Sequence, residues 1–390
     1  MTIMAEETKE KVFQFVDAHR DEMIALWKEL VGIESGSDDK AGVDAVAVRL
    51  ERELKKAGAT TRIIPMAKAG NMLVGEFGAR NDQQGVLFIG HMDTVFKAGT
   101  LAERPFTIRE GKAYGPGVLD MKGGIITFLY AIKALKAAGY DTRPIKIVLA
   151  GDEEIGHENS NATDVFAEEA KGYVAAFNCE TGFVDDGIVV GRKGSVRFTI
   201  DVQGVAAHVG NDPENGRNAI LEMSHKVIAI QALTDWEEGT TYNVGTIQGG
   251  TVANAVPDHA KIIVDVRYKD PALLPDIQKK MEQIADKTYV DGTHTVMSMR
   301  NSIIPMKTTD EIHQLFSLVK TVYQENGFGE PYEKSVGGGS DSAYTVLAGV
   351  PTVCAMGVKG GRNHSPEEYA VVDTLFERAK LLAACVLKLK

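Results

Sequence analysis

Acidic and histidine side chains follow directly after several short apolar runs of this sequence. One run ends at His91, and Asp93 lies two positions later. A second run ends at an acidic stretch that includes Glu153 and Glu154, and a third ends at Glu180. Ligands in open α/β sheets bind outside the carboxyl ends of the strands, so these side chains are expected to converge. Histidine and carboxylate groups together are ligands typical of divalent metal ions such as zinc.

Each of these residues has an ordinary explanation when it is taken alone. His91 and Asp93 could form a packed, hydrogen-bonded pair, and the two adjacent glutamates could lie in a solvated acidic loop. Asp120 precedes a predicted helix, where capping is the commonest role for an aspartate. His364 could lie in a surface loop. Their joint occurrence, mostly at the ends of predicted strands, favours a shared site over separate structural explanations.

The elements that must position these residues alternate between helices and short apolar strands. Apolar residues at helical spacing predict helices over residues 6–31, 43–57 and 124–138. Strands that are buried on both faces and separated by helices imply a mostly parallel sheet flanked by helices. The predicted strands cover residues 72–77, 86–89, 145–150 and 173–177.

The middle of the chain has a different pattern, typical of a smaller antiparallel α+β unit. After it, helices and a strand resume the first pattern. We therefore expect an α/β catalytic domain in two parts, residues 1–194 and 301–390, with an inserted α+β lid domain at residues 195–300. The strands predicted for this lid cover residues 196–203, 241–247 and 260–268, and its helices cover 219–233 and 271–286.

Length, charge and cysteine content exclude several classes of protein. A chain of 390 residues is longer than one hydrophobic core usually serves, which agrees with two domains. The net charge of -11 argues against binding to nucleic acid, which requires clustered lysine and arginine. No apolar stretch approaches the ~20 residues of a membrane-spanning helix. Three scattered cysteines, and no apolar N-terminal segment of signal-peptide length, favour a cytoplasmic location.

Six short motifs lie in order along the chain. They are Gly-His-Met-Asp-Thr-Val (90–95), Gly-Pro-Gly-Val-Leu-Asp-Met-Lys-Gly-Gly (115–124), Asp-Glu-Glu-Ile-Gly (152–156), Glu-Thr (180–181), Gly-Gly-Gly-Ser-Asp (337–341) and His-Ser-Pro-Glu-Glu-Tyr (364–369). Together they resemble the metallopeptidase family of glutamate carboxypeptidase, aminoacylase, acetylornithine deacetylase and succinyl-diaminopimelate desuccinylase. The resemblance covers nearly the whole chain and is strongest to the bacterial glutamate carboxypeptidase branch, through residues 265–268 and 337–344. It implies a zinc-exopeptidase-like catalytic domain with an inserted lid or dimerisation domain.

The resemblance further implies two divalent metal ions held by five residues. Asp120 would bridge both ions, His91 and Glu180 would complete one site, and Glu154 and His364 would complete the other. Two ions ~3.5–4 Å apart activate a water molecule between them. The mixed set of histidine and carboxylate ligands suits zinc best, with cobalt or manganese as alternatives.

Residues around the ions also acquire roles from this resemblance. Glu153, which must stay unligated, would act as general base, and Asp93 would orient the His91 ring. The peptide bond after Asp120 is expected to be cis. His208 would stabilise the oxyanion in the active site of the partner subunit, which implies a homodimer formed through the lid.

Substrate contacts are expected from the lid and from the glycine-rich motif. Arg192 and Arg300 are candidates for binding a substrate carboxylate, and for both the alternative is an ordinary surface charge. The complete set of predicted substrate-binding residues is Asn254, Arg267, Arg300, Arg192, Gly339 and Ser340.

These features predict a two-metal hydrolase that cleaves an amide bond and releases a free amino acid, as a glutamate carboxypeptidase or an N-acyl-amino-acid deacylase would. Glutamate at position 180 resembles the branches acting on N-acylated or C-terminal amino acids, whereas aminopeptidase branches usually carry aspartate there. A dipeptidase or aminopeptidase of the same family is the alternative. A metal-binding homologue without catalysis is disfavoured, because Glu153 and all five ligands are present.

Overall fold

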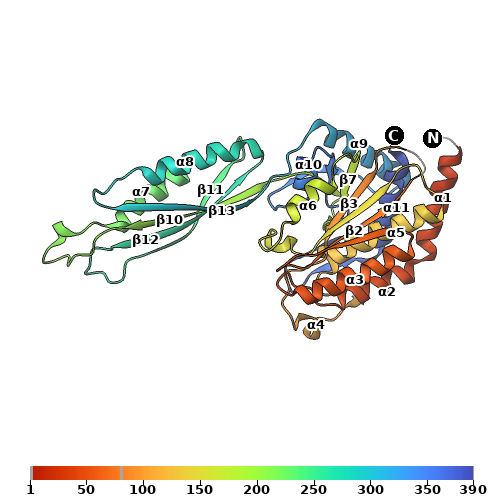
Figure 1. Ribbon diagram of the computed structural model, residues 1–390, viewed down its shortest axis with the longest axis horizontal. Coiled ribbons are helices and arrows are strands. Elements are labelled where there is room, and N and C mark those ends of the chain that lie inside the picture. Colours follow the sequence, from red (N-terminus) through yellow and green to blue (C-terminus); the bar gives the residue numbers. More distant parts are fainter. Residues whose placement is uncertain (1–2, 80–81, 390) are drawn as a thin grey trace. The chain divides into compact units, whose positions relative to one another are not determined.

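The computed structural model describes residues 3–79 and 82–389, apart from the side chains of residues 3–5, 301 and 302. The chain folds into two compact units. The first comprises the chain up to Val190, residues Thr308–Ser335 and the chain from Asp341 onward. The second comprises Gly191–Lys307 together with Val336–Ser340. Each unit has its own sheet and helices, as Figure 1 shows.

A six-stranded sheet with the order β1-β2-β6-β3-β7-β15 lies at the centre of the first unit (Figure 1). The strands β6, β3, β7 and β15 run parallel, as predicted. At one edge, β2 pairs antiparallel with β6, and β1 pairs antiparallel with β2. All residues of β3 and β7 are buried, which requires cover on both faces of the sheet. The strands are β1 (Thr60–Ile64), β2 (Met72–Phe77), β3 (Val86–His91), β6 (Ile145–Ala150), β7 (Ala175–Asn178) and β15 (Thr352–Val353).

Helices pack against this sheet and against one another. On β3, the ring of Phe88 stacks between Phe128 of α5 and Phe177 of β7. α11 packs along α5 and α1. The predicted N-terminal helix is two helices, because the backbone leaves the helical conformation at His19, where φ is -110° and ψ is 16°. Nδ1 of His19 lies 2.7 Å from the carbonyl oxygen of Phe15. The helices of this unit are α1 (Ile3–Ala18), α2 (Arg20–Val31), α3 (Lys40–Lys56), α4 (Thr100–Glu103), α5 (Gly124–Ala137), α6 (Ala162–Glu169), α9 (Asp310–Asn326), α10 (Ser342–Leu347) and α11 (Val372–Lys388).

A second sheet of very short strands, in the order β4-β5-β17-β16-β8, was not predicted. Strands of two or three residues are too short for an alternating pattern to be recognised in the sequence. This sheet matters because three of the predicted ligands lie in the loops next to its strands. The strands are β4 (Thr107–Arg109), β5 (Lys112–Tyr114), β8 (Gly182–Phe183), β16 (Lys359–Gly361) and β17 (Tyr369–Val371), and a separate pair consists of β9 (Gly187–Arg192) and β14 (Tyr332–Val336).

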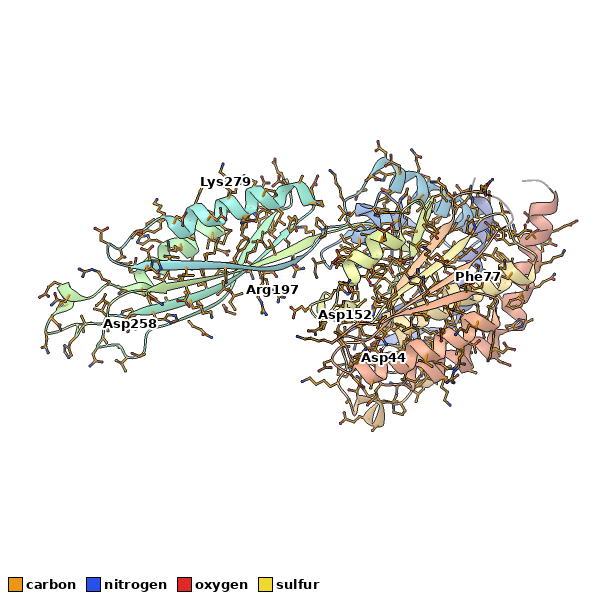
Figure 2. All side chains as sticks on the ribbon, viewed as in Figure 1. Asp44, Phe77, Asp152, Arg197, Asp258 and Lys279 are labelled. Atoms are coloured by element: carbon orange, nitrogen blue, oxygen red, sulfur yellow. The ribbon has the colours of Figure 1, made fainter. Side chains whose placement is uncertain are left out.

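The second unit is a four-stranded antiparallel sheet, β11-β12-β10-β13, with α7 and α8 on one face (Figure 1). Alternate residues of β10, such as Phe198 and Ile200, are buried in a core shared with Met223 of α7 and Met281 of α8. Arg197 lies on the other side of the sheet, where it is exposed (Figure 2). The sequence predicted this unit without β13. Its elements are β10 (Gly194–Gln203), α7 (Ala219–Gln231), β11 (Thr241–Gly249), β12 (His259–Tyr268), α8 (Leu274–Asp286) and β13 (His294–Ile303).

Two further findings concern the chain as a whole. None of the cysteines, Cys179, Cys354 and Cys385, forms a disulfide, and all three are buried. Within the part of the chain that the structure describes, no helix is both long enough and apolar enough to cross a membrane.

Candidate metal centre

The five predicted ligands come from loops and strand ends that meet at the carboxyl edge of the central sheet. His91 is the last residue of β3, Glu154 follows β6, and Glu180 follows β7. These three strands are neighbours in the sheet. Asp120 lies in a tight turn between β5 and α5, and His364 lies in the loop between β16 and β17. The fold therefore brings together residues that are far apart in the sequence.

The ligand atoms form two groups that share Asp120. Atoms of His91, Asp120 and Glu180 lie within 4.8 Å of one another, and so do atoms of Asp120, Glu154 and His364. One carboxylate oxygen of Asp120 is 3.3 Å from Nε2 of His91, and the other is 3.1 Å from Nε2 of His364. Nε2 of His364 is also 3.1 Å from a carboxylate oxygen of Glu154. A carboxylate that offers one oxygen to each group has the geometry of a bridging ligand.

Several buried polar atoms at this site make no hydrogen bond, which indicates that cations fit there. Among the described residues, Nε2 of His91, Oδ1 of Asp120 and Oε1 of Glu154 are buried and make no hydrogen bond. Burial, followed by the charge of Glu180, raises the pKa of Glu153 well above its usual value. Burial also raises the pKa of Glu154. Crowded, desolvated carboxylates are unfavourable unless positive charge compensates them, and a divalent cation supplies such charge.

Asp93 fixes both the His91 ring and the loop that carries the two glutamates. Its carboxylate oxygens accept the backbone N–H groups of Glu153 and Glu154, each at 3.1 Å. Ser37 donates to the same carboxylate at 2.7 Å. Nδ1 of His91 lies 3.3 Å from a carboxylate oxygen of Asp93 and 3.1 Å from its carbonyl oxygen. The sequence suggested only the contact with His91, and the structure adds the two backbone hydrogen bonds.

The turn that carries Asp120 is held by two residues that were not predicted. The peptide bond between Asp120 and Met121 is cis, as the resemblance implied. The carboxylate of Glu368 accepts the N–H groups of Leu119 at 2.8 Å and Asp120 at 3.0 Å, and burial raises the pKa of this glutamate to about 7. Asn363 donates to Asp120 Oδ2 at 3.1 Å. Glu368 belongs to the motif at residues 364–369 and Asn363 precedes it, so the available signal was their position beside the predicted ligand His364.

Four of the predicted substrate-binding residues lie together in the second unit. Arg192 donates to the carbonyl oxygen of Gly339 at 3.1 Å, and Arg267 donates to that of Gly337 at 3.3 Å. Ser340, the next residue along the chain, is buried. The two arginines thus support the backbone of the glycine-rich segment, which is a different contact from the carboxylate binding that was considered for Arg192.

The remaining predicted residues of the second unit are exposed. His208 pairs with Ala255 in an isolated bridge, so the loops that carry His208 and Asn254 are adjacent. Arg300 lies opposite Arg197 across the β10–β13 pair. These residues lie in one unit and the metal ligands in the other, and the roles of His208, Asn254 and Arg300 stay predictions.

The fold and the site together define a class of protein. An α/β sheet flanked by helices carries two histidines and three carboxylates at one edge, with an additional half-buried glutamate, Glu153, beside them. Residues of these types hold divalent metal ions and use them to hydrolyse amide bonds. The chain is therefore a metal-dependent hydrolase.

The comparison with protein families identifies the family of hydrolases to which the chain belongs. The chain belongs to the peptidase family M20/M25/M40, whose model matches residues 87–388. It is 30% identical over 394 residues to carboxypeptidase G2 of Pseudomonas sp. strain RS-16, an alignment that covers 100% of this chain and 94% of that protein. It is 27% identical over 303 residues to succinyl-diaminopimelate desuccinylase of Sulfurovum sp. strain NBC37-1, covering 73% of this chain and 78% of that protein. The family predicted from the motifs is thereby confirmed.

Solved structures of other proteins have the same fold as this chain. The aminopeptidase PepT from Bacillus cereus superposes with a TM-score of 0.81 at 23% identity, covering 95% of this chain and 98% of that one. The M20 family metallo-carboxypeptidase Sso-CP2 from Sulfolobus solfataricus gives 0.73 at 19% identity, covering 94% and 99%. An aminopeptidase and a carboxypeptidase thus share this architecture, so the fold does not decide which substrate is cleaved.

Proposed function

We propose that this chain is a two-metal amide hydrolase that releases a free amino acid from substrates whose amino group is blocked. The observation that carries the proposal is the sharing of Asp120 between two groups of ligand atoms, with the half-buried Glu153 beside them. A single-metal site would have no need for a second histidine and a second glutamate around the other oxygen of Asp120. The mixed histidine and carboxylate ligands favour zinc, with cobalt or manganese as alternatives.

In the proposed reaction, the metal ions and the surrounding residues have separate roles. When bound, the two ions would polarise the scissile carbonyl and lower the pKa of the attacking water. Glu153 accepts the proton of that water and delivers it to the nitrogen of the leaving amine. Asp93 keeps the glutamate loop in place through the two backbone hydrogen bonds. His208 and Asn254 donate hydrogen bonds to the carbonyl oxygen as negative charge develops on it.

The choice of substrate class rests on Glu180 and on the similarity to carboxypeptidase G2. Glutamate at this position resembles the carboxypeptidase and deacylase branches, and carboxypeptidase G2 aligns over the entire chain. Since Arg192 and Arg267 donate to the glycine-rich segment, we propose that they shape the part of the pocket that binds the carboxylate of the released amino acid. Arg300 is the exposed cation that we propose as a direct contact for that carboxylate.

We also propose a homodimer formed through the second unit. α7 exposes Ile220, Leu221 and Ile228, which have exposed fractions of 38%, 49% and 70%. β11, at the edge of the sheet, exposes Ile247 at 57%. An apolar helix face beside an unpaired edge strand is the type of surface that another subunit covers. In such a dimer His208 would act in the active site of the partner. We also propose a cytoplasmic location, because Cys179, Cys354 and Cys385 form no disulfide.

The experiment that tests the main proposal is hydrolysis of a defined panel by enzyme reconstituted with zinc, cobalt or manganese. One half of the panel contains N-acyl amino acids and folate-type glutamates, and the other half contains dipeptides with a free amino group. We expect amino acid release from the blocked substrates only, with complete loss in the presence of a chelator. Cleavage of the free-amine peptides alone would show the enzyme to be a dipeptidase or aminopeptidase and would remove the support that Glu180 lends to the carboxypeptidase function.

A further inference from the structure

A buried histidine connects two segments of the first unit next to the glutamate loop. Nδ1 of His157 lies 2.9 Å from Oδ1 of Asp152, and Nε2 of His157 lies 2.6 Å from Oδ1 of Asp341. The exposed fractions of His157, Asp152 and Asp341 are 7%, 0% and 2%. Figure 2 labels Asp152, which follows β6. The imidazole therefore bridges two carboxylates that are far apart in the sequence.

Asp152 and Asp341 each lie next to a segment that carries a predicted site residue, Glu153 in one case and Ser340 in the other. Asp152 directly precedes Glu153, and its carbonyl oxygen accepts the backbone N–H of His157 at 3.0 Å, which closes the loop that carries the glutamates. Within this loop Gly156 has a φ of +66°, a conformation that favours glycine. Asp341 directly follows Ser340, the last residue of the glycine-rich segment. The His157 ring thus links the loop of Glu153 to the start of α10.

The charged form of His157 is stabilised by the neighbouring carboxylates of Asp152 and Asp341. Burial alone would lower the pKa of His157, but the charges and hydrogen bonds of Asp341 and Asp152 raise it well above its usual value. A buried cation between two buried carboxylates is stable only while all three remain paired. Ser160 adds a hydrogen bond to Oδ1 of Asp152 at 2.9 Å. The rings of Phe166 and Tyr344 enclose the imidazole, with centroids 6.3 and 5.9 Å away.

We infer that His157 is a positioning residue for Glu153, acting through Asp152 and Asp341. This inference rests on the proposed role of Glu153 as general base. Asp93 holds the backbone N–H groups of the glutamate loop, and His157 holds the residue before it, so the loop is fixed at two separate points. His157, Asp152 and Asp341 belong to neither group of ligand atoms. Loss of the His157 bridge therefore disturbs the placement of the base while leaving the metal ligands present.

The test compares His157→Gln with the control Ser160→Ala in otherwise intact, metal-loaded enzyme. Ser160→Ala removes a hydrogen bond to the same oxygen of Asp152 but keeps the bridge to Asp341. We expect His157→Gln to lower kcat by about 10- to 100-fold, because small misplacement of a catalytic group has effects of this size. KM, metal content and the visible spectrum of the cobalt-loaded enzyme should stay as in the parent. Ser160→Ala should retain kcat within about twofold.

Hydrogen exchange provides a readout that does not depend on activity. In His157→Gln, the peptide that contains Glu153 and Glu154 should exchange its amide hydrogens faster, whereas β10 in the second unit should be unchanged. A His157→Gln enzyme with parental kcat, or one whose loss of kcat is explained by loss of metal, would overturn the inference. Asp341→Asn serves as the second variant if His157→Gln does not fold, and it should reproduce the fall in kcat.

The double variant separates this inference from the proposed function. If His157 and Asp341 act as one bridge, His157→Gln combined with Asp341→Asn should be no slower than the slower single variant. Multiplicative losses would show two independent effects and overturn the bridge. Glu153→Gln is measured alongside: if it retains activity, the proposed base is wrong. If it is inactive while His157→Gln is unimpaired, only the positioning role fails.

Discussion

Asp120 is the residue on which both groups of ligand atoms depend. Its two oxygens face different histidines, and the turn that carries it is fixed by Glu368 and Asn363. The other ligands each belong to one group only. The consequence of replacing a ligand should therefore differ between Asp120 and the rest.

We expect Asp120→Ala to lose both metal ions, while Glu180→Ala retains the ion of the other group. The affinity of each affected site should fall by more than the 10–100-fold typical of residues that merely support ligands. Metal analysis after dialysis against a weak chelator measures the stoichiometry. Equal metal content in the two variants would contradict a bridging role for Asp120.

Glu153→Gln is expected to lower kcat by about 10²–10⁴-fold, the contribution usual for a general base. Glutamine keeps the size of the side chain but cannot take the proton of the attacking water. Metal content should be unchanged, because Glu153 belongs to neither group of ligand atoms. Steady-state kinetics together with metal analysis provide the measurement, and a variant with parental kcat would remove Glu153 from its proposed role.

At this scale the sequence predicted the residues that share a motif or a strand end, such as His91 and Glu180. It gave no role to Glu368, although this residue lies in the motif at residues 364–369, or to His157, because their importance comes from a contact with a distant segment. Glu368 bonds to the backbone near Asp120, and His157 reaches Asp341. Neither partner is suggested by spacing, and histidine in a loop is an unspecific signal by itself.

Among the elements, α5 begins in very close contact with the strand end that carries a ligand. A Cβ atom on Gly124, the first residue of α5, would overlap the carbonyl oxygen of Cys179, the residue before Glu180. Glycine therefore allows the helix that follows the Asp120 turn to approach the Glu180 loop. The segments that carry the predicted ligands Asp120 and Glu180 can approach each other because Gly124 has no side chain.

Replacement of Gly124 by alanine is expected to destabilise the protein by at least the ~1–3 kcal/mol that overpacking costs. The clash is with backbone, which cannot rotate away as a flexible side chain can. Metal content should fall as well, because Glu180 is displaced. The control is Gly78→Ala, where a Cβ would meet nothing within 4 Å. Thermal unfolding and metal analysis of the two variants test this, and equal unfolding temperatures would contradict the close contact.

The long elements were predictable because periodic apolar residues extend over them. β13 was missed, and so was the sheet that contains β5 and β16. β13 has mixed polar and apolar residues and lies at the edge of its sheet, so its burial pattern is weak. The break at His19 is confined to one residue whose backbone leaves the helical conformation, and apolar periodicity does not reveal it.

Acid stability is a property of the whole molecule that Glu53 should influence. Glu53 of α3 accepts hydrogen bonds from Lys133 of α5 at 2.8 Å and from Arg49 at 2.9 Å. Burial alone would raise its pKa, but Lys133 and Arg49 lower it from 4.5 to about 2. The folded-state pKa is thus below the unfolded one. The stabilisation is fully present above pH 4.5 and is lost as the pH falls through about 2.

Glu53→Gln should accordingly reduce the free energy of unfolding by about 1–2 kcal/mol at pH 7, a value discounted for partial solvent screening. The difference from the parent should shrink as the pH is lowered below 4.5. Denaturant unfolding at a series of pH values measures it, with Glu10→Gln as an exposed control. A difference that grows with falling pH would mean that Glu53 does not stabilise the fold through its ionised form.

The proposed dimer leads to a prediction on the same scale. Ile228→Glu places a charge on the exposed face of α7 and should shift the mass in solution from twice 42.2 kDa to the mass of one chain. Val184→Glu, which alters an aliphatic residue of the first unit with an exposed fraction of 60%, should leave the mass unchanged. Light scattering during gel filtration makes the measurement. A parent protein that is already monomeric would exclude the dimer and the trans role of His208.

At the scale of the whole molecule, the change of pattern in the middle of the chain predicted the existence of a second unit. Nothing in the sequence indicated that Val336–Ser340 returns to that unit. Five residues rich in glycine have no apolar periodicity, and their place in the second unit is shown by hydrogen bonds with Arg192, Arg267 and the backbone of Lys193.

The order in which the segments of the two units are synthesised determines when the nascent chain can become active. Most of the second unit is one continuous stretch, which is synthesised before the last segments of the first unit. The first unit cannot be completed at that stage, since α11, which packs on α5 and α1, is made after it. Of the five predicted metal ligands, His364 is the last to be synthesised. A nascent chain therefore lacks part of the proposed metal centre through most of its synthesis, and we expect hydrolytic activity only once His364 and α11 have been added.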